Sequence, residues 1–316
     1  MMEPLTVLMA VRNGEPFLQM AMDSILAQSY RAFRVLIVDD ASTDLTRDIV
    51  RAYSDRRIEL LCLERNVGQT AALNIGLRHA STPWIARMDA DDFSAPNRLE
   101  RQMQAVAEDR VVRCVGTGVW EFQDDPREVV LTKTRPQEHA EIKRAALCGS
   151  GMIHGSIVVD RAALLDVGAF DERYRYASDR EMFLRFLDRY RAMNLSAPLL
   201  GLRRHTNQDS FSLGAANEYI EIFERCLADA RYTAEERAIL RSSLAFSHLF
   251  RARCLRRQGA YGAWTKDVAQ ALRLSPRTWM RNALGTLSAR MLPGRLRAPF
   301  RNQIFLERSA ETACQR

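Results

Sequence analysis

Three aspartates lie within four consecutive positions of the stretch MDADDF: Asp89, Asp91 and Asp92. They follow PWIAR, an apolar run typical of the end of a buried strand. Carboxylates this close repel one another, and a hard divalent cation offsets that repulsion while it keeps positions for water or phosphate oxygens. The chain has no GxxxxGK[ST] or GxGxxG loop that would bind phosphates through backbone amides. The cluster therefore predicts Mn²⁺ or Mg²⁺ bound together with a nucleotide diphosphate.

Short apolar runs alternate with helix patterns along the first two hundred residues, and these elements must position the cluster. We expect strands at 5–11, 33–40, 58–63, 83–88 and 111–119. We expect one helix after the first strand and others at 45–53, 68–80 and 95–109. This alternation predicts an α/β fold with a Rossmann-like, mainly parallel central sheet flanked by helices.

Polar residues follow four of the expected strands. They are Arg12, Asn13 and Gly14 after the first, Asp39 and Asp40 after the second, Arg65 and Asn66 after the third, and the aspartate cluster after the fourth. The carboxyl ends of parallel strands meet at one edge of a sheet, where ligands bind. Each Asp or Asn alone could cap a helix or form a turn. Their convergence on one edge favours a ligand site.

The second half of the chain has a different pattern. We expect helices at 138–147 and 178–192, a strand at 153–160, a polar loop at 201–212 and helices from about 216 onward. The stretch 244–276 resembles one helix–turn–helix repeat of the tetratricopeptide type, and a single repeat is too short for an independent array. We therefore predict a catalytic domain at 1–215 and a basic helical region at 216–316 that is appended to it.

Six segments resemble, in order, the motifs of the family 2 inverting glycosyltransferases, which have the GT-A fold. They are AVRNGEPFL, LIVDDASTDLT, RNVGQTAALNIGL, IARMDADDFSAPNRLERQ, GAFDERYRYASDREMFLR and RRHTNQDSFS, and the resemblance covers about residues 5–212. The resemblance implies sugar transfer from a nucleotide-diphospho-sugar to a glycan or lipid-linked acceptor, as in polysaccharide or cell-envelope biosynthesis. A UDP-sugar is the expected donor, and dTDP- and GDP-sugars are the alternatives.

The resemblance also implies roles for single residues. The nucleotide-sugar would be bound by Val11, Asn13, Asp39, Asp40, Asn66, Asp89, Ala90 and Asp91. The metal ion would be bound by Asp89, Asp91, Asp92 and His205. Asp179 falls on the general-base position, from which one carboxylate deprotonates the acceptor hydroxyl and inverts the anomeric centre.

Several positions depart from the family pattern or have a second interpretation. Arg12 stands where the family often has Tyr, Ala41 where it often has Gly, and SDREM replaces ED-x-D-L, so that Ser178 replaces an acidic neighbour. Asp179 could instead cap the helix that follows it. His154 is either an acceptor-site residue or a histidine of the core, and the core interpretation is favoured.

Two other classes of protein could use the same acidic edge. One is a non-catalytic nucleotide-sugar-binding or scaffold protein at the membrane surface, against which Asp91 and Asp179 argue. The other is a nucleotidyltransferase, which would normally have a glycine-rich basic loop near its start; RNGEP is a poor version of that loop.

The distribution of charge and of cysteines indicates where the protein is located in the cell. Residues 251–316 carry 14 Arg and Lys against three Asp and Glu, and a basic amphipathic pattern within 274–305 could lie on an anionic membrane or pack on the catalytic domain. Nucleic-acid binding is not expected, because no recognition fold accompanies this charge. The scattered cysteines and the absence of a signal-peptide pattern favour free thiols in the cytoplasm, with possible peripheral attachment to the inner face of the membrane.

Overall fold

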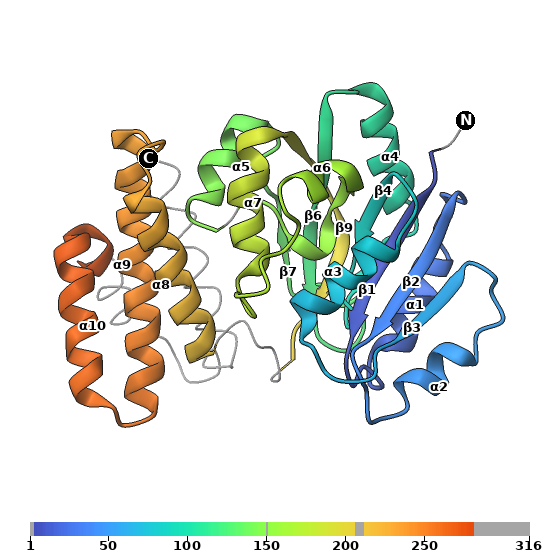
Figure 1. The fold of residues 1–316 in the computed structure, drawn as a ribbon, viewed down its shortest axis with the longest axis horizontal. Coiled ribbons are helices and arrows are strands. Elements are labelled where there is room, and N and C mark those ends of the chain that lie inside the picture. The colour runs from blue at the N-terminus through green and yellow to red at the C-terminus, as the bar shows by residue number, and fades with distance from the viewer. Residues whose placement is uncertain (1–2, 150, 206–211, 281–316) are drawn as a thin grey trace. The chain divides into compact units, whose positions relative to one another are not determined.

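The computed structural model describes residues 3–149, 151–205 and 212–280. The chain divides into two compact units, which are described separately below. The first comprises Met1–Lys143 and Met152–Gln208, and the second comprises Arg144–Gly151 and Asp209–Arg316. Figure 1 shows strands and helices in the first unit and long helices in the second.

The strands of the first unit are β1 (Leu5–Val11), β2 (Phe33–Asp39), β3 (Ile58–Cys62), β4 (Trp84–Arg87), β5 (Phe93–Ser94), β6 (Val112–Phe122), β7 (Leu131–Lys133), β8 (Val158–Asp160) and β9 (Arg191–Arg203). The helices are α1 (Leu18–Leu26), α2 (Thr46–Arg51), α3 (Gln69–His79), α4 (Arg98–Glu108), α5 (His139–Ala146, which continues into the second unit), α6 (Arg161–Asp166) and α7 (Ser178–Arg189). A 3-10 turn, η1, spans His154–Ser156.

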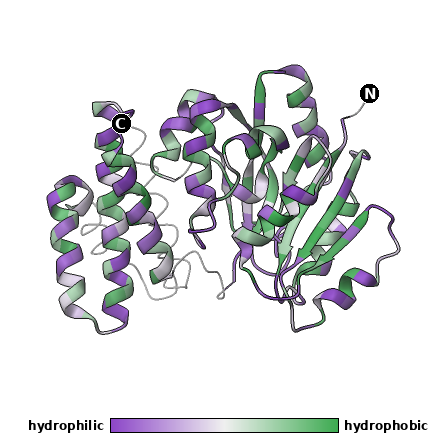
Figure 2. Cartoon of the chain, in the orientation of Figure 1, coloured by the Kyte–Doolittle hydropathy of each residue, from purple (hydrophilic) through white to green (hydrophobic). Residues whose placement is uncertain are grey.

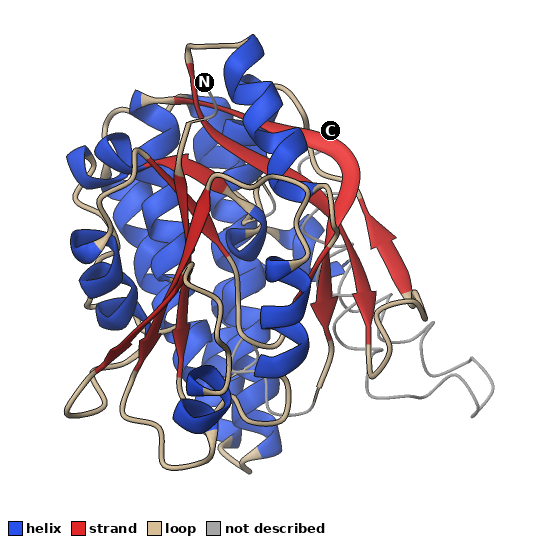
Figure 3. Cartoon of the chain, turned by 90° about the vertical axis from the view of Figure 1, so that its right-hand side faces the viewer, coloured by secondary structure: helices blue, strands red, loops and turns tan. Residues whose placement is uncertain are grey.

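The sheet has the strand order β3-β2-β1-β4-β8-β6-β9-β5, with β7 paired to β6, and Figure 3 shows it twisted and flanked by helices. Strand β1 pairs in parallel with β2 and β4, and β2 pairs in parallel with β3. In this register Val11 lies opposite Asp39, and Asp39 lies opposite Cys62. The carboxyl ends of these strands therefore meet at one edge, as the sequence predicts.

Burial explains why these runs form central strands. Every residue of β1 is buried, as expected of a parallel strand covered on both faces, and Figure 2 shows β1 and β2 as mostly hydrophobic. Helix α3 lies close against β1 and β2 because Gly76 has no side chain: a Cβ there would stand 2.4 Å from Leu8 Cδ1. The α/β fold with a largely parallel sheet is confirmed.

Three expectations for the second half of this unit are wrong in their bounds. The segment 153–160 is a 3-10 turn followed by the short strand β8, which pairs antiparallel with β4 and β6. The helix expected at 178–192 ends at Arg189, and strand β9 starts at Arg191. The loop expected from 201 begins only after Arg203, because β9 continues to that residue in parallel with β6.

The second unit contains helices α8 (Leu213–Ala228), α9 (Ala234–Arg257) and α10 (Tyr261–Leu274). Thr233 and Glu236 form a capping box that starts α9. Ala245 and Leu249 of α9 pack against Ala271 of α10, which forms the helical hairpin expected at 244–276. None of the described helices is both long and apolar enough to span a bilayer. From position 281 onward, the predicted amphipathic tail (274–305) lies outside the described residues.

The thiol prediction holds for four cysteines and fails for one. Cys62, Cys114, Cys226 and Cys254 carry thiols, whereas Cys148 is disulfide-bonded, so the thiol expectation is wrong at that position.

Candidate functional site

The turn after β1 and the turn after β2 are joined by reciprocal hydrogen bonds. The backbone N–H of Asn13 donates to Ser42 Oγ at 2.9 Å, and the N–H of Thr43 donates to Asn13 Oδ1 at 2.9 Å. Asn13 and Ala41 both adopt a positive φ of 54°. Buried Val11 ends β1 just before this pair of turns, so the residues predicted to line a base pocket do lie together.

The two aspartates after β2 have different partners. Asp40 accepts the N–H groups of Val67 and Gly68 at 2.7 and 2.9 Å and so holds the loop after β3, which contains Asn66. Asp39 is fully buried, and its Oδ2 accepts from Arg47 Nε at 2.6 Å. Asp39 Oδ1 is buried without a hydrogen-bond partner in the described structure.

Asp89 follows β4 and is held from two sides. Its Oδ1 accepts from Arg87 Nη2 at 2.5 Å and from Gln69 Nε2, at the start of α3, at 3.1 Å. Ala90 comes next and lies near the β1 turn, since a Cβ on Gly14 would stand 3.9 Å from Ala90 Cβ. The aspartate cluster thus contacts elements that follow both β1 and β3.

The end of β9 reaches the same cluster. The backbone N–H of Arg203 donates to Asp92 Oδ1 at 3.1 Å, and Arg203 Nε donates to the carbonyl of Asp91 at 3.0 Å. Two residues further along, His205 Nε2 lies 3.0 Å from Asp91 Oδ2. Asp91 and His205 therefore meet although 114 positions separate them in the chain.

Burial and mutual repulsion give the three carboxylates different acidities. Burial raises the pKa of Asp92 well above its usual value, and the charges of Asp91 and Asp89 add to that rise. Burial and the charge of Asp89 raise the pKa of Asp91. Burial also disfavours the charged form of Asp89, but its ion pair with Arg87 outweighs this effect, so its pKa is lowered. Positive charge beside Asp91 would relieve the repulsion.

Asp179 lies in the first turn of α7, where its Oδ1 accepts the N–H of Arg180 at 2.7 Å. Burial raises the pKa of Asp179, and the charge of Asp89 raises it further despite the opposing effect of Arg180. Since the charge of Asp89 acts on Asp179, Asp179 lies within electrostatic reach of the aspartate cluster. A carboxylate with a raised pKa is a stronger base than an ordinary one, as a general base requires.

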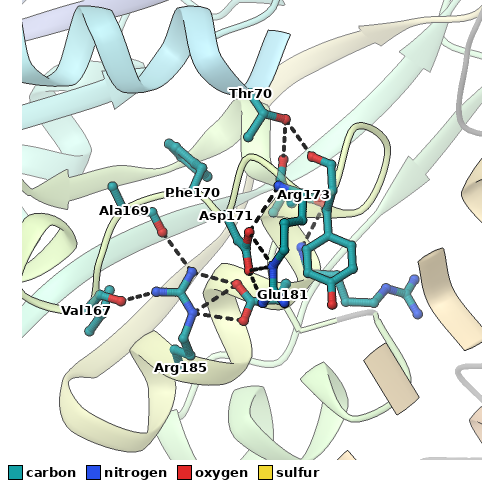
Figure 4. Close-up of polar contacts among 12 residues, drawn as sticks. Thr70, Val167, Ala169, Phe170, Asp171, Arg173, Glu181 and Arg185 are labelled. Atoms are coloured by element: carbon teal, nitrogen blue, oxygen red, sulfur yellow. Dashed lines mark hydrogen bonds and ion pairs between the residues drawn. The ribbon is translucent and has the colours of Figure 1, made fainter. Parts of the chain in front are cut away.

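A polar network fixes the segment that leads to Asp179 (Figure 4). Arg185 binds the buried Glu181 carboxylate, with Nη2 at 2.6 Å from Oε2, and also binds the carbonyls of Val167 and Ala169. From α3, Thr70 Oγ1 donates to the carbonyl of Tyr174 at 2.8 Å. Asn74, also on α3, bonds the backbone of Phe170 through both ends of its amide. Asp179 is thereby fixed relative to α3.

His154 belongs to η1, beside the same cluster. Its ring lies edge-on to Phe170 and Phe183, with ring centroids 5.1 and 6.5 Å away. Burial, with a contribution from Arg87, lowers the pKa of His154 to about 3, so the imidazole is neutral. Its Nε2 is buried without a hydrogen-bond partner in the described structure. The aromatic contacts fit the core interpretation, but the unpartnered nitrogen does not.

The side chains at this edge of the sheet are suited to binding a metal ion together with a ligand that completes its coordination. Asp91 and His205 offer a carboxylate oxygen and an imidazole nitrogen 3.0 Å apart, both suitable for Mn²⁺. Among the described residues, no group of three or more His, Cys, Asp or Glu could hold a metal by itself. A diphosphate and water would have to complete the coordination.

Sequence reasoning missed several residues that build this edge. Arg87 and Arg203 hold the aspartate cluster, and Gln69 connects it to α3. Arg87 carries a local signal, since it is a charged residue at the end of a buried strand. Arg203 opens the RRHTNQDSFS segment that resembles a family motif, but its contacts with the cluster were missed because its strand was not predicted.

Comparison with known proteins gives a family and several relatives. The sequence model described as "Glycosyl transferase family 2" matches residues 6–172. EpsE of Bacillus subtilis is 31% identical over 231 residues, which are 70% of this chain and 81% of EpsE. The Escherichia coli protein WfgD, named as a UDP-Glc:α-D-GlcNAc-diphosphoundecaprenol β-1,3-glucosyltransferase, is 31% identical over 159 residues, which are 50% of this chain and 61% of WfgD.

A solved structure has the same fold. The mannosyltransferase PcManGT of Pyrobaculum calidifontis, in complex with GDP-Man and Mn²⁺, superposes with a TM-score of 0.63 at 21% identity. The match covers 100% of this chain and 88% of that one. The likeness confirms the GT-A architecture that the sequence motifs predict.

Proposed function

This chain belongs to glycosyl transferase family 2, and we propose that it is a metal-dependent, inverting enzyme that uses a nucleotide-diphospho-sugar. One observation carries the proposal: the Asp91–His205 pair and Asp179 lie on elements held around the same aspartate cluster. A metal-binding pair and a carboxylate of raised pKa are what transfer from a diphosphate donor requires.

Each residue at this edge has a defined task in the proposed mechanism. The turns at Asn13 and Asp40, with the loop of Asn66, would bind the nucleotide. Asp89 and Ala90 would contact the donor beside them. Asp179 would take the proton of the acceptor hydroxyl. The acceptor oxygen would then attack the anomeric carbon from the face opposite the nucleotide, displace the nucleoside diphosphate and invert the anomeric centre. A glycosidase would need a second carboxyl as acid, whereas here the leaving group is a diphosphate.

Asp91 and His205 would hold the metal ion, and Asp89 and Asp92 would lie beside it. A bound Mn²⁺ or Mg²⁺ supplies Lewis-acid stabilisation of the departing diphosphate. The protein's part is to hold the two ligands together, which Arg203 does by binding the Asp91 carbonyl and the Asp92 carboxylate from β9. The Mn²⁺ in the PcManGT complex supports a divalent cation here.

The proposed donor is a UDP-sugar, and the proposed acceptor is a glycan or a lipid-linked sugar. The name of WfgD, which contains both UDP-Glc and a diphosphoundecaprenol acceptor, supports this choice. GDP-sugars are the first alternative, because PcManGT binds GDP-Man, and dTDP-sugars are the second. We place the protein in the cytoplasm, with attachment to the inner face of the membrane through its basic C-terminal region.

A thermal-shift screen of UDP-, GDP- and dTDP-sugars, each with Mn²⁺, Mg²⁺ or EDTA, tests the proposal. We expect a UDP-sugar to raise Tm only when the metal is present, and Asp91→Ala to abolish this shift. Released nucleoside diphosphate is then measured with a panel of acceptors. Binding without turnover across the panel would instead favour the non-catalytic scaffold, and metal-independent binding would refute the metal site.

A further inference from the structure

His154 lies between the aspartate cluster and helix α7. Phe183, which its ring contacts, follows Asp179 by four residues and so projects from the same face of α7. On the other side, a Cβ on Gly155 would stand 3.2 Å from Asp92 Oδ2 and 3.3 Å from Asp89 Oδ2. The turn that carries His154 is therefore pressed against two carboxylates of the cluster.

The buried Nε2 of His154 needs an explanation. Nearly all buried polar atoms in proteins have a hydrogen-bond partner, and an unpaired one costs about 1–3 kcal/mol. The contacts with Phe170 and Phe183 involve only the ring, so a phenylalanine would serve the packing as well. Since the nitrogen adds nothing to this packing, a ligand that supplies the missing partner accounts for it.

We propose that His154 is a specificity-determining residue whose Nε2 hydrogen-bonds a hydroxyl of the donor's transferred sugar. The inference rests on the proposed function, in which Asp89 contacts the donor and Asp179 takes the proton of the acceptor hydroxyl. Sugar hydroxyls both donate and accept, so either tautomer of the neutral ring can bind one. A nucleotide without a sugar would not reach this nitrogen.

Two substitutions separate this role from a packing role. His154→Phe keeps an aromatic ring against Phe170 and Phe183 but removes the nitrogen, and His154→Gln places an amide near the position of Nε2. His79→Phe is the matched control, because His79 is a half-exposed histidine paired with Glu59 on the surface. Thermal unfolding without ligand should show that His154→Phe folds with a Tm equal to or above that of the wild type.

The dissociation constants of UDP and of the tightest-binding UDP-sugar are measured with Mn²⁺ by calorimetry. We expect His154→Phe to weaken UDP-sugar binding about three- to tenfold, the range of one hydrogen bond, and to leave UDP binding unchanged. His154→Gln should recover part of the loss, and the control should match the wild type.

Equal affinities of wild type and His154→Phe for the UDP-sugar would overturn the inference, and so would a parallel loss of UDP affinity. If the wild-type protein binds neither UDP nor any nucleotide-sugar, the proposed function itself has failed. A failure of the His154 inference alone is recognised by nucleotide-sugar binding that is present in the wild-type protein.

Discussion

His205 Nε2 and Asp91 Oδ2 lie 3.0 Å apart, and this contact joins the end of β9 to the aspartate cluster after β4. We expect His205→Ala to weaken Mn²⁺ binding at least tenfold when UDP is present, because one of the two protein ligands is lost. Titration of Mn²⁺ followed by Tm measures the effect. His79→Ala is the control, and an unchanged Mn²⁺ midpoint in His205→Ala would contradict this ligand assignment.

The ionised carboxylate of Asp92 should lower the free energy of unfolding at neutral pH when no metal is present. Burial raises its pKa in the folded state, so the folded protein binds the proton more tightly than the unfolded chain does. Stability therefore falls as the pH rises from the ordinary Asp pKa of about 3.9 through the folded value. Asp92→Asn should lose the contribution of Asp92 to this fall and should be at least ~1 kcal/mol more stable at pH 7.5.

Urea unfolding in EDTA at several pH values tests this prediction. The stability difference between Asp92→Asn and the wild type should be small near pH 4 and grow as the pH rises. A difference that is constant with pH would show that the Asp92 carboxyl does not titrate as proposed. Asp109→Asn, which changes a more exposed carboxylate, is the control.

The first unit was largely predictable because its signals are local. LTVLMAV and VLIV are buried strands whose sequence runs identify them directly, and the parallel register then brings Asn13, Asp39 and Asp40 to one edge. The aspartate cluster marks its own strand end. For these residues, strand position and chain order alone determine where they meet.

Strand β9 could not be predicted, and the contacts of Arg203 were missed with it. Its pairing with β6 shifts register at Thr117/Gly118 and at Gly118/Val119, and Pro198 lies opposite Gly118. These irregularities remove the regular alternation by which a strand is recognised. The antiparallel β8 was obscured for a related reason, since three residues of its predicted span form a 3-10 turn instead.

The departure from the family pattern at Ala41 has a consequence for backbone strain. The family often has Gly at this position, and here Ala adopts a φ of 54°, which is unfavourable for a residue with a Cβ. We expect Ala41→Gly to raise the unfolding free energy by roughly 1 kcal/mol, measured by urea denaturation. Ala52→Gly, at a residue with negative φ just after α2, should be neutral or destabilising; stabilisation by both changes would exclude strain as the cause.

Arg185 should be a major stabilising residue of the segment before Asp179. Arg185→Met removes the guanidinium that binds the Glu181 carboxylate, a group that is only 2% exposed, and should lower the unfolding free energy by ~3 kcal/mol. Because the same change releases the carbonyls of Val167 and Ala169, turnover should fall more than donor affinity.

Two further variants test whether loss of the buried Glu181–Arg185 ion pair causes the expected destabilisation. Glu181→Leu combined with Arg185→Met removes both charges and should recover much of the stability. Arg173→Ala breaks an exposed pair with Asp171 and should cost less than ~1 kcal/mol. If Arg185→Met is no more destabilising than Arg173→Ala, the buried pair does not hold the segment.

The pH dependence of turnover should report the state of Asp179. Its pKa is raised by burial and by the charge of Asp89, and only the deprotonated form can act as a base. With saturating donor and metal, kcat should rise with pH through a pKa above the ordinary Asp value of about 3.9 and then level off. Asp179→Asn should keep donor affinity, lower kcat about 10²–10⁴-fold and lose the acidic limb of the profile. Arg180→Ala removes the positive charge that opposes the rise in the pKa of Asp179 and should move the acidic limb of the profile to higher pH. An acidic limb that persists in Asp179→Asn would assign the base to another residue.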